Sequence, residues 1–302
     1  SRRGRFRLGP TTLIASDPFG LFPVRRRAGS VREVVVLPPT VPLASFPIPA
    51  GRLSGGEALR QRTYQVTPNA AGVREYAPGD GLGRIHWKST ARRDRLISKE
   101  FELDPMADVW ILLDGQRRMH FSIEGTEESL GGAPGRLLRL PPRSEEYMAA
   151  AAATVALHVL GRNRATGLLG YGAARLVVQP ERGEAQLFRI LEALAGFRAE
   201  SDVDLSDVLR IESDWFPRGA TVVLFTPNVR EDLYPRLLEL RRRGLVPVAT
   251  LIEPSDFGSR QSALPLGRAL SDAGIPVRIV RRGQPLEHSL GRPPGVSQRD
   301  AA

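Results

Sequence analysis

Two hydrophobic patterns divide the chain. Up to about residue 50, short β-like runs separated by turn residues predict strands at residues 5–8, 11–15, 21–25 and 31–37. Beyond about residue 105, short apolar runs alternate with segments of helical periodicity. This alternation predicts an α/β fold with a doubly wound, mostly parallel sheet, preceded by a small β domain.

The predicted elements of the α/β domain follow one another closely. Apolar runs predict strands at residues 108–113, 166–171, 175–178, 221–225, 246–252 and 276–280. Helices are predicted from residue 144 to Gly161 and at 187–194, 233–240 and 266–273, where glycines or basic residues mark the ends. The predicted order is therefore that of strands followed by crossover helices.

Irregular stretches set the predicted boundaries. A Pro-rich stretch and Ser54-Gly55-Gly56 predict a flexible loop at residues 51–71. Residues 115–143 form a long interruption, for which we expect disorder, with a partner-gripping loop as the alternative. We predict one small β domain with a signature segment from residues 1–50 and 72–104, an α/β domain at 105–283, and a disordered tail at 284–302.

The composition favours a folded protein and excludes functions that need cysteine. Of 302 residues, 41% are hydrophobic and 25% are charged, as in ordinary globular proteins. The absence of cysteine excludes disulfides, thiolate metal sites and a cysteine nucleophile. We also expect neither a signal peptide nor a membrane span in this chain, and we expect an upstream segment in the natural protein, because the chain starts at Ser1 with arginines at once.

The net charge points to acidic partners. The chain has 43 Lys and Arg against 33 Asp and Glu, a formal charge of +10, and its only lysines are Lys88 and Lys99. An arginine-rich surface of this kind suits nucleic acid, anionic lipid or an acidic protein. Charge by itself does not choose among these three.

The most distinctive segment is residues 73–102. Pro78-Gly79 fits the centre of a type II turn, and Asp80 can then cap a short helix. On that helix, four-residue spacing places Arg84, Lys88 and Arg92 on one side. Alternating residues at 96–101 predict a strand.

This segment resembles the signature of the domain of unknown function 58 family. That signature has the form R-E-Y-x-P-G-D, then R-x-I-H-W-K and A-R, and then a strand ending in K-E. Residues 17–21, Asp-Pro-Phe-Gly-Leu, also resemble the family's opening motif. The matching residues are Arg74, Glu75, Tyr76, Pro78, Gly79, Asp80, Arg84, Ile85, His86, Trp87, Lys88, Ala91, Arg92, Lys99 and Glu100.

The resemblance implies a prokaryotic protein with a von Willebrand A-like domain. Such domains are commonly preceded by membrane helices and encoded beside a MoxR-type AAA+ ATPase. It therefore implies a soluble domain at the cell membrane that faces the cytoplasm, tethered through an upstream segment.

Two interpretations of the signature remain open. Its charged residues can form a buried ionic network that locks the β domain onto the α/β domain, which is the interpretation we favour. Alternatively, Arg84, Lys88 and Arg92 form an exposed surface for an acidic partner or a phosphate. His86 is expected to be structural, because no nucleophile is identifiable near it.

A von Willebrand A-like domain raises the question of a metal site. Such sites use an Asp-x-Ser-x-Ser run, a Thr from a later loop and an Asp after a central strand. Here the run is Asp114 followed by Gly115-Gln116-Arg117-Arg118, the later loop offers Ser201 and Asp202, and the central strand ends in Thr226-Pro227-Asn228. We predict that these residues are the remnant of a metal site and that they hold no metal or other cofactor. We expect them to face an acidic protein surface instead.

These observations favour a non-enzymatic adaptor in protein assembly, and the resemblance implies a MoxR-type AAA+ ATPase as its partner. The residues offer neither a nucleophile–base pair nor a metal cluster, so we expect no enzyme. The alternative is binding of nucleic acid or another anionic surface through an arginine-rich face, with a steep dependence on salt.

Overall fold

The computed structural model describes residues 3–48, 70–75, 87–93, 95–101, 107–124, 128–129 and 139–291. The chain divides into two compact units, one of residues 1–49 with 108–302 and the other of residues 50–107. This grouping differs from the predicted one, in which residues 1–50 join residues 72–104. The predicted flexible loop at 51–71 lies outside the described residues, apart from Ala70 and Ala71.

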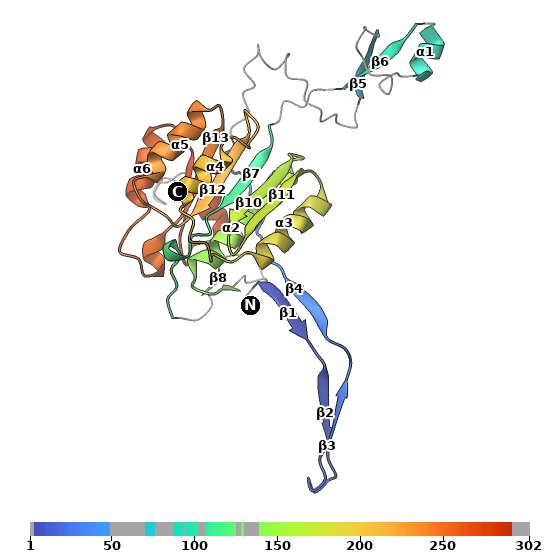
Figure 1. Cartoon of the computed structure of the whole chain (residues 1–302), viewed down its shortest axis with the longest axis vertical. Helices are drawn as coiled ribbons and strands as arrows, with labels where there is room; N and C mark the ends of the chain where they lie inside the picture. The colour runs from blue at the N-terminus through green and yellow to red at the C-terminus, as the bar shows by residue number, and fades with distance from the viewer. Residues whose placement is uncertain are drawn as a thin grey trace, which may run out of the picture. The chain divides into compact units, whose positions relative to one another are not determined.

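A six-stranded sheet forms the centre of the larger unit (Figure 1). All neighbouring strands are parallel except the hairpin of β10 and β11. The predicted fold class, an α/β domain with a doubly wound, mostly parallel sheet, is confirmed. The strands lie in the order β11 (Arg175–Glu181), β10 (Thr166–Tyr171), β7 (Val109–Leu113), β12 (Thr221–Thr226), β13 (Val246–Ile252) and β14 (Val277–Val280).

Strand β7 shows why helices cover both faces. Its side chains alternate, so that Ile111 packs in the core on one face while Trp110 and Leu112 pack in the core on the other. A strand buried on both faces must be apolar throughout, as the sequence predicted. The first face is covered by α2 (Ser144–Leu160), α3 (Glu184–Gly196) and α7 (Leu286–Gly291), and the second by α4 (Leu205–Glu212), α5 (Leu233–Arg242) and α6 (Leu264–Asp272).

Helix α2 is buried almost all round. Residues 149–153 are five alanines, none of them exposed, and a helix of this kind needs cover on two sides. The sheet covers one side, and the Pro-rich segment 37–48 covers the other. Val41 N donates to Thr154 Oγ1 (3.3 Å), and His158 Nδ1 lies 3.0 Å from Leu43 O.

The N-terminal strands form a two-stranded ribbon rather than a closed β domain (Figure 1). The antiparallel pairs are β1 (Gly4–Leu8) with β4 (Arg32–Val36) and β2 (Thr11–Ala15) with β3 (Val24–Ala28). The third strand begins at residue 24, where residue 21 was predicted, because Asp17 extends the turn. Its Oδ1 accepts a hydrogen bond from Phe22 N (2.7 Å).

Two segments predicted to be irregular are partly ordered. Within residues 115–143, a 3₁₀ turn, η2 (Arg117–Met119), follows β7, and β8 (Glu128–Ser129) pairs with β9 (Arg139–Leu140). Within the predicted tail, α7 buries Leu286 and Leu290 against the core. Another 3₁₀ turn, η3 (Pro254–Phe257), follows β13.

The smaller unit contains a hairpin of β5 (Ala70–Glu75) and β6 (Ile97–Phe101), with α1 (Trp87–Arg93) between the two strands in sequence. Thr90 Oγ1 accepts a hydrogen bond from Ile97 N (3.0 Å), and Ile97 is buried. Among the helices of the described ranges, in both units, none has the length and hydrophobicity needed to cross a bilayer.

Candidate functional site

Asp114 follows β7 at the carboxyl edge of the sheet, where open α/β sheets bind ligands. The side chain is buried and both carboxylate oxygens are engaged. Oδ1 accepts from Gln116 N (2.9 Å) and Oδ2 from Thr226 Oγ1 (2.5 Å). Burial raises the pKa of Asp114, although His120 and these two hydrogen bonds oppose the shift.

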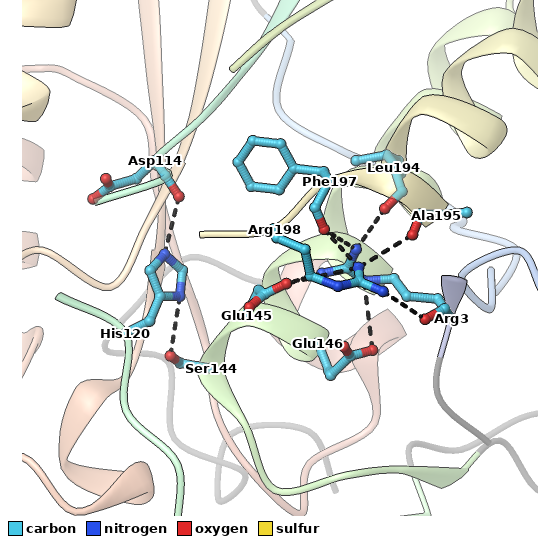
Figure 2. Close-up of polar contacts among 10 residues, drawn as sticks. All are labelled: Arg3, Asp114, His120, Ser144, Glu145, Glu146, Leu194, Ala195, Phe197 and Arg198. Carbon is cyan, nitrogen blue, oxygen red and sulfur yellow. Dashed lines mark hydrogen bonds and ion pairs between the residues drawn. The ribbon is translucent and has the colours of Figure 1, made fainter. Parts of the chain in front are cut away.

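A chain of hydrogen bonds continues from the backbone of Asp114 (Figure 2). His120 Nε2 lies 2.9 Å from Asp114 O, and His120 Nδ1 lies 3.2 Å from Ser144 Oγ. The Ser144 hydroxyl is fully buried and also accepts from Phe121 N (3.0 Å). Because His120 faces the backbone carbonyl of Asp114 and not its carboxylate, this chain fixes the loop after β7 onto α2 and does not assemble a catalytic triad.

Arginines surround the acidic residues at this edge. Arg117 Nη2 lies 3.1 Å from Asp202 Oδ1, while Arg118 Nη2 and Arg230 Nη1 lie 3.0 and 3.1 Å from Asp204 Oδ2. The amide of Gln116, assigned from its neighbours, places its oxygen 2.7 Å from Arg118 Nη2. Positive charge at this edge therefore comes from guanidinium groups.

Asp204 also caps α4. Its Oδ1 accepts from Ser206 N (3.0 Å), an ordinary N-cap bond. Partial burial acts to raise the pKa of Asp204, but the hydrogen bond from Ser206 N and the neighbouring arginines outweigh it and lower the pKa. Asp204 thus remains a carboxylate that holds Arg118 and Arg230 in place.

The predicted remnant residues come together at this edge, and the side-chain oxygens of Asp114 and Ser201 are engaged in internal hydrogen bonds. Two backbone hydrogen bonds join Ser201 to the loop after β7. Arg117 N donates to Ser201 O and Ser201 N donates to Gly115 O, both at 2.9 Å. Its hydroxyl accepts from Val203 N (3.0 Å). Asp202 is 88% exposed and faces Arg117.

These residues do not fit a divalent cation. Such an ion needs several free oxygen ligands. The side-chain oxygens of Asp114 and Ser201 accept hydrogen bonds from within the protein, and the carboxylate of Asp204 forms ion pairs with two guanidinium groups. In the described part of the chain, no group of three or more His, Cys, Asp or Glu is placed to hold a metal. That the protein holds no metal stays a prediction.

Divalent cations are therefore expected to leave the stability unchanged. A site that bound Mg²⁺ or Mn²⁺ at 100 times its Kd would stabilise the fold by about 2.7 kcal/mol. Thermal melts with each ion at millimolar concentration and with EDTA make the comparison. A saturable rise in the melting midpoint that Asp114→Asn removes would contradict the expectation.

The sequence did not reveal a neighbouring cluster beside β10. Arg175 Nε and Nη2 donate to the two oxygens of buried Glu212 (both 2.8 Å), Tyr171 Oη also donates to Glu212, and the guanidinium stacks 5.3 Å from the Trp215 ring centroid. The Arg175 hydrogen bond is the main cause that lowers the pKa of Glu212. The apolar spacing of Leu205, Val208 and Leu209 after Asp204 was an available signal for α4, which carries Glu212.

A second polar cluster joins the ribbon to the helices (Figure 2). The buried guanidinium of Arg3 donates to Leu194 O (2.6 Å) and Phe197 O (2.5 Å) at the end of α3, and to Glu145 Oε1 (2.6 Å) in α2. Its Nε lies 3.5 Å from Glu146 Oε2. A cation beside a helix C-terminus and carboxylates in a first helical turn both favour the helix dipoles.

Half of the ten predicted signature residues lie within the described part of the chain. Arg74 and Glu75 are in β5, while Trp87, Lys88 and Arg92 are on α1 and exposed. Tyr76, Gly79, Asp80, Arg84 and His86 lie outside the described residues. Neither the buried network nor the exposed arginine surface is tested, and both interpretations stay open.

Comparison with known proteins assigns the family. The profile described as "Protein of unknown function DUF58" matches residues 72–258, more than half of the chain. The chain belongs to this family. That match includes the signature segment and the arginine-bearing sheet edge.

Individual relatives are more distant. The chain is 25% identical over 234 residues to "Uncharacterized protein YeaD" of Bacillus subtilis (strain 168), which covers 77% of this chain and 51% of that protein. The chain thus spans about half the length of this curated relative.

Solved structures with similarity include conserved hypothetical protein BatB from Bacteroides thetaiotaomicron, with 10% identity over 61% of this chain and 93% of that one, and a TM-score of 0.39. Proximal thread matrix protein 1 from the mussel byssus gives 12% identity over 61% of this chain and 46% of that one, and a TM-score of 0.38. We draw no functional argument from likeness at this level.

Proposed function

We propose that this DUF58 protein is a non-enzymatic adaptor whose arginine-bearing sheet edge binds an acidic segment of a partner protein. The observation that carries the proposal is the exposed Arg117 beside Asp202 at the carboxyl edge, where Arg230 pairs with Asp204. The side chain of Arg117 is 66% exposed, and an ion pair this exposed contributes about 0–1 kcal/mol. A carboxylate of a partner can replace Asp202 at little cost and accept the same guanidinium hydrogen bonds.

The edge is also preorganised for such a partner. Asp204 holds Arg118 and Arg230, and the backbone of Ser201 holds the chain at Arg117. Rigid placement of the arginines lowers the entropy lost on binding. The same features suit a protein carboxylate better than a metal, which would need the oxygens that the arginines now contact.

For the partner we propose a MoxR-type AAA+ ATPase, and for the location the cytoplasmic face of the cell membrane, with this chain as the soluble part of an anchored protein. The support is the family signature, since the resemblance implies an ATPase of that type encoded beside these proteins. The acidic segment would then belong to the ATPase or to a client that both proteins handle.

Retention of the purified ATPase on the immobilised 302-residue chain, with and without ATP, tests the proposal. We expect Arg117→Glu to weaken retention at least about ten-fold, because it replaces attraction by like-charge repulsion. Arg230→Gln should weaken it less, since that residue is partly engaged with Asp204.

The matched control is Arg189→Glu on α3, where the arginine is exposed and paired with Glu181 in the same way. It should bind like the unaltered protein. If the unaltered chain retains no ATPase in either nucleotide state, the proposed partner is wrong. Equal retention by Arg117→Glu and the unaltered chain would show that the sheet edge is not the binding surface.

A further inference from the structure

We propose that the tip of the N-terminal ribbon, residues 16–23, inserts into the surface of an anionic lipid bilayer. The ribbon is the pair of hairpin segments from residue 4 to residue 36, and its tip contains the Asp-Pro-Phe-Gly-Leu motif. This binding site is separate from the sheet edge and does not depend on the proposed adaptor function.

The tip presents apolar side chains to solvent. Phe19 is 84% exposed and Phe22 is 74% exposed, and Leu21 between them is exposed as well. Three large apolar residues within four positions are a concentration that soluble surfaces avoid unless something covers it. The tip therefore has the chemistry of a surface that leaves water when its partner binds.

The tip also has a defined conformation. Asp17 Oδ2 accepts from Phe19 N (3.2 Å), Asp17 Oδ1 accepts from Phe22 N (2.7 Å), and Asp17 O accepts from Gly20 N (2.9 Å). These bonds satisfy backbone donors that would otherwise need water, so the turn can enter a less polar environment at a lower cost. The carboxylate of Asp17 is thereby turned toward the backbone of the turn.

Arginines follow the tip on both faces of the ribbon. In the register of β2 and β3, Arg25 lies opposite Ile14, Arg26 opposite Leu13 and Arg27 opposite Thr12. Because successive strand residues point to opposite faces, Arg26 lies on one face and Arg25 and Arg27 on the other. Within the described residues, no acidic side chain is in ion-pair range of these three arginines.

This distribution favours a bilayer over a protein as the occupant. A protein partner would cover one face, and the ribbon would then be apolar on that face and charged on the other. Here both faces carry exposed apolar residues, Leu13 and Val24 on one and Ile14 on the other, together with arginine. A lipid surface surrounds an inserted tip on all sides, so that apolar tip residues meet acyl chains while a collar of arginines meets phosphates.

Flotation of the 302-residue chain with lipid vesicles tests the inference. Vesicles of phosphatidylcholine with phosphatidylglycerol should bind the chain at low salt, and vesicles of phosphatidylcholine alone should bind it weakly. Each arginine near the surface contributes about a five-fold increase in partitioning, so Arg25→Gln/Arg26→Gln/Arg27→Gln should lower binding on the order of 100-fold. Phe19→Ser/Phe22→Ser should lower it by a similar factor, roughly 100-fold.

Matched controls separate the tip from the general surface. Phe188→Ser removes an exposed phenylalanine from α3, and Arg189→Gln/Arg210→Gln/Arg218→Gln removes three exposed arginines from the larger unit. Both should float like the unaltered chain. The tip variants should also keep their melting midpoint and their retention of the ATPase, so that failure of this inference and failure of the adaptor proposal are distinguishable.

Several results would overturn the inference. The inference is wrong if the unaltered chain does not float with anionic vesicles at low salt. It is also wrong if the tip variants and the control variants lose vesicle binding equally. Self-association in sedimentation velocity that the tip variant abolishes, without vesicle binding, would assign the tip to a second copy of the chain. Tighter binding to a DNA duplex than to vesicles, lost in the arginine variant but kept in Phe19→Ser/Phe22→Ser, would assign the arginines to nucleic acid.

Discussion

Replacing Gly115 with alanine is expected to destabilise the larger unit by about 3 kcal/mol. A Cβ at this position would lie 1.6 Å from Tyr171 O and 2.5 Å from Tyr171 C, and both atoms are backbone. Neither side can yield easily. Tyr171 ends a central strand, and Gly115 O accepts a hydrogen bond from Ser201 N (2.9 Å).

The same change should displace the sheet edge. Gly115 directly precedes Gln116 and Arg117, so a shifted backbone moves the arginines that we propose to bind the partner. Urea unfolding followed by circular dichroism measures the stability, and ATPase retention measures the effect on the edge.

Gly196→Ala is the control for Gly115→Ala. Gly196 is the last residue of α3, and a Cβ there meets nothing within 4 Å. Alanine should be neutral or stabilise the helix by up to about 1 kcal/mol. Equal unfolding midpoints for Gly115→Ala and the unaltered protein would show that the loops after β7 and β10 move apart freely.

Arg3→Met is expected to cost about 3–5 kcal/mol at neutral pH, because it removes one side of a buried ion cluster. Methionine keeps the apolar stem but leaves Glu146 and the carbonyls of Leu194 and Phe197 without the guanidinium. Because Arg3 joins β1 to α2 and α3, the base of the ribbon should also loosen. Faster amide hydrogen exchange in β1 and β4 would report this loosening.

The loss should depend on pH. Burial is the main cause that raises the pKa of Glu146 above its ordinary value of 4.5, and Arg3 is the main influence that opposes it. Without Arg3 the folded pKa rises further, so the ionised form of Glu146 destabilises the variant more. As the pH falls through that raised pKa, Glu146 becomes protonated, and the difference in stability between the variant and the unaltered protein should shrink.

Arg5→Met is the control for Arg3→Met. Arg5 contacts Glu33 and Glu192 at an exposed position, where ion pairs contribute little. Its effect should be below about 1 kcal/mol and nearly independent of pH. If the two variants were equally stable, Arg3 would not anchor the ribbon.

The periodicity of the sequence was sufficient for the α/β domain. A strand buried on both faces reads as an apolar run, as β7 does throughout and β12 does between its terminal threonines. This run is visible in the local sequence. Helix α4 was missed because its eight residues give few turns of periodicity, and α7 because its six residues give fewer still. For the N-terminal region the sequence predicted strands within a small β domain, whereas the structure has two antiparallel pairs that form a ribbon.

For the candidate site, the sequence determined the residue types at the end of β7. It showed that Gln116 and Arg118 replace the serines of a metal site, and from this we predicted that the edge faces an acidic protein surface instead of a cation. The tertiary structure decided which carboxylates those arginines meet, because Asp202 and Asp204 belong to the segment before α4, far away in the sequence.

The tertiary structure also decided the place of Arg3. In the sequence it is one of several arginines near the N-terminus, with nothing to set it apart from Arg5 or Arg7. In the fold it alone of these three is buried, where the end of α3 and the start of α2 meet. A charged side chain can be buried only where distant groups form hydrogen bonds and ion pairs with it. The local pattern of a sequence indicates local structure but does not indicate which distant groups will lie beside that side chain.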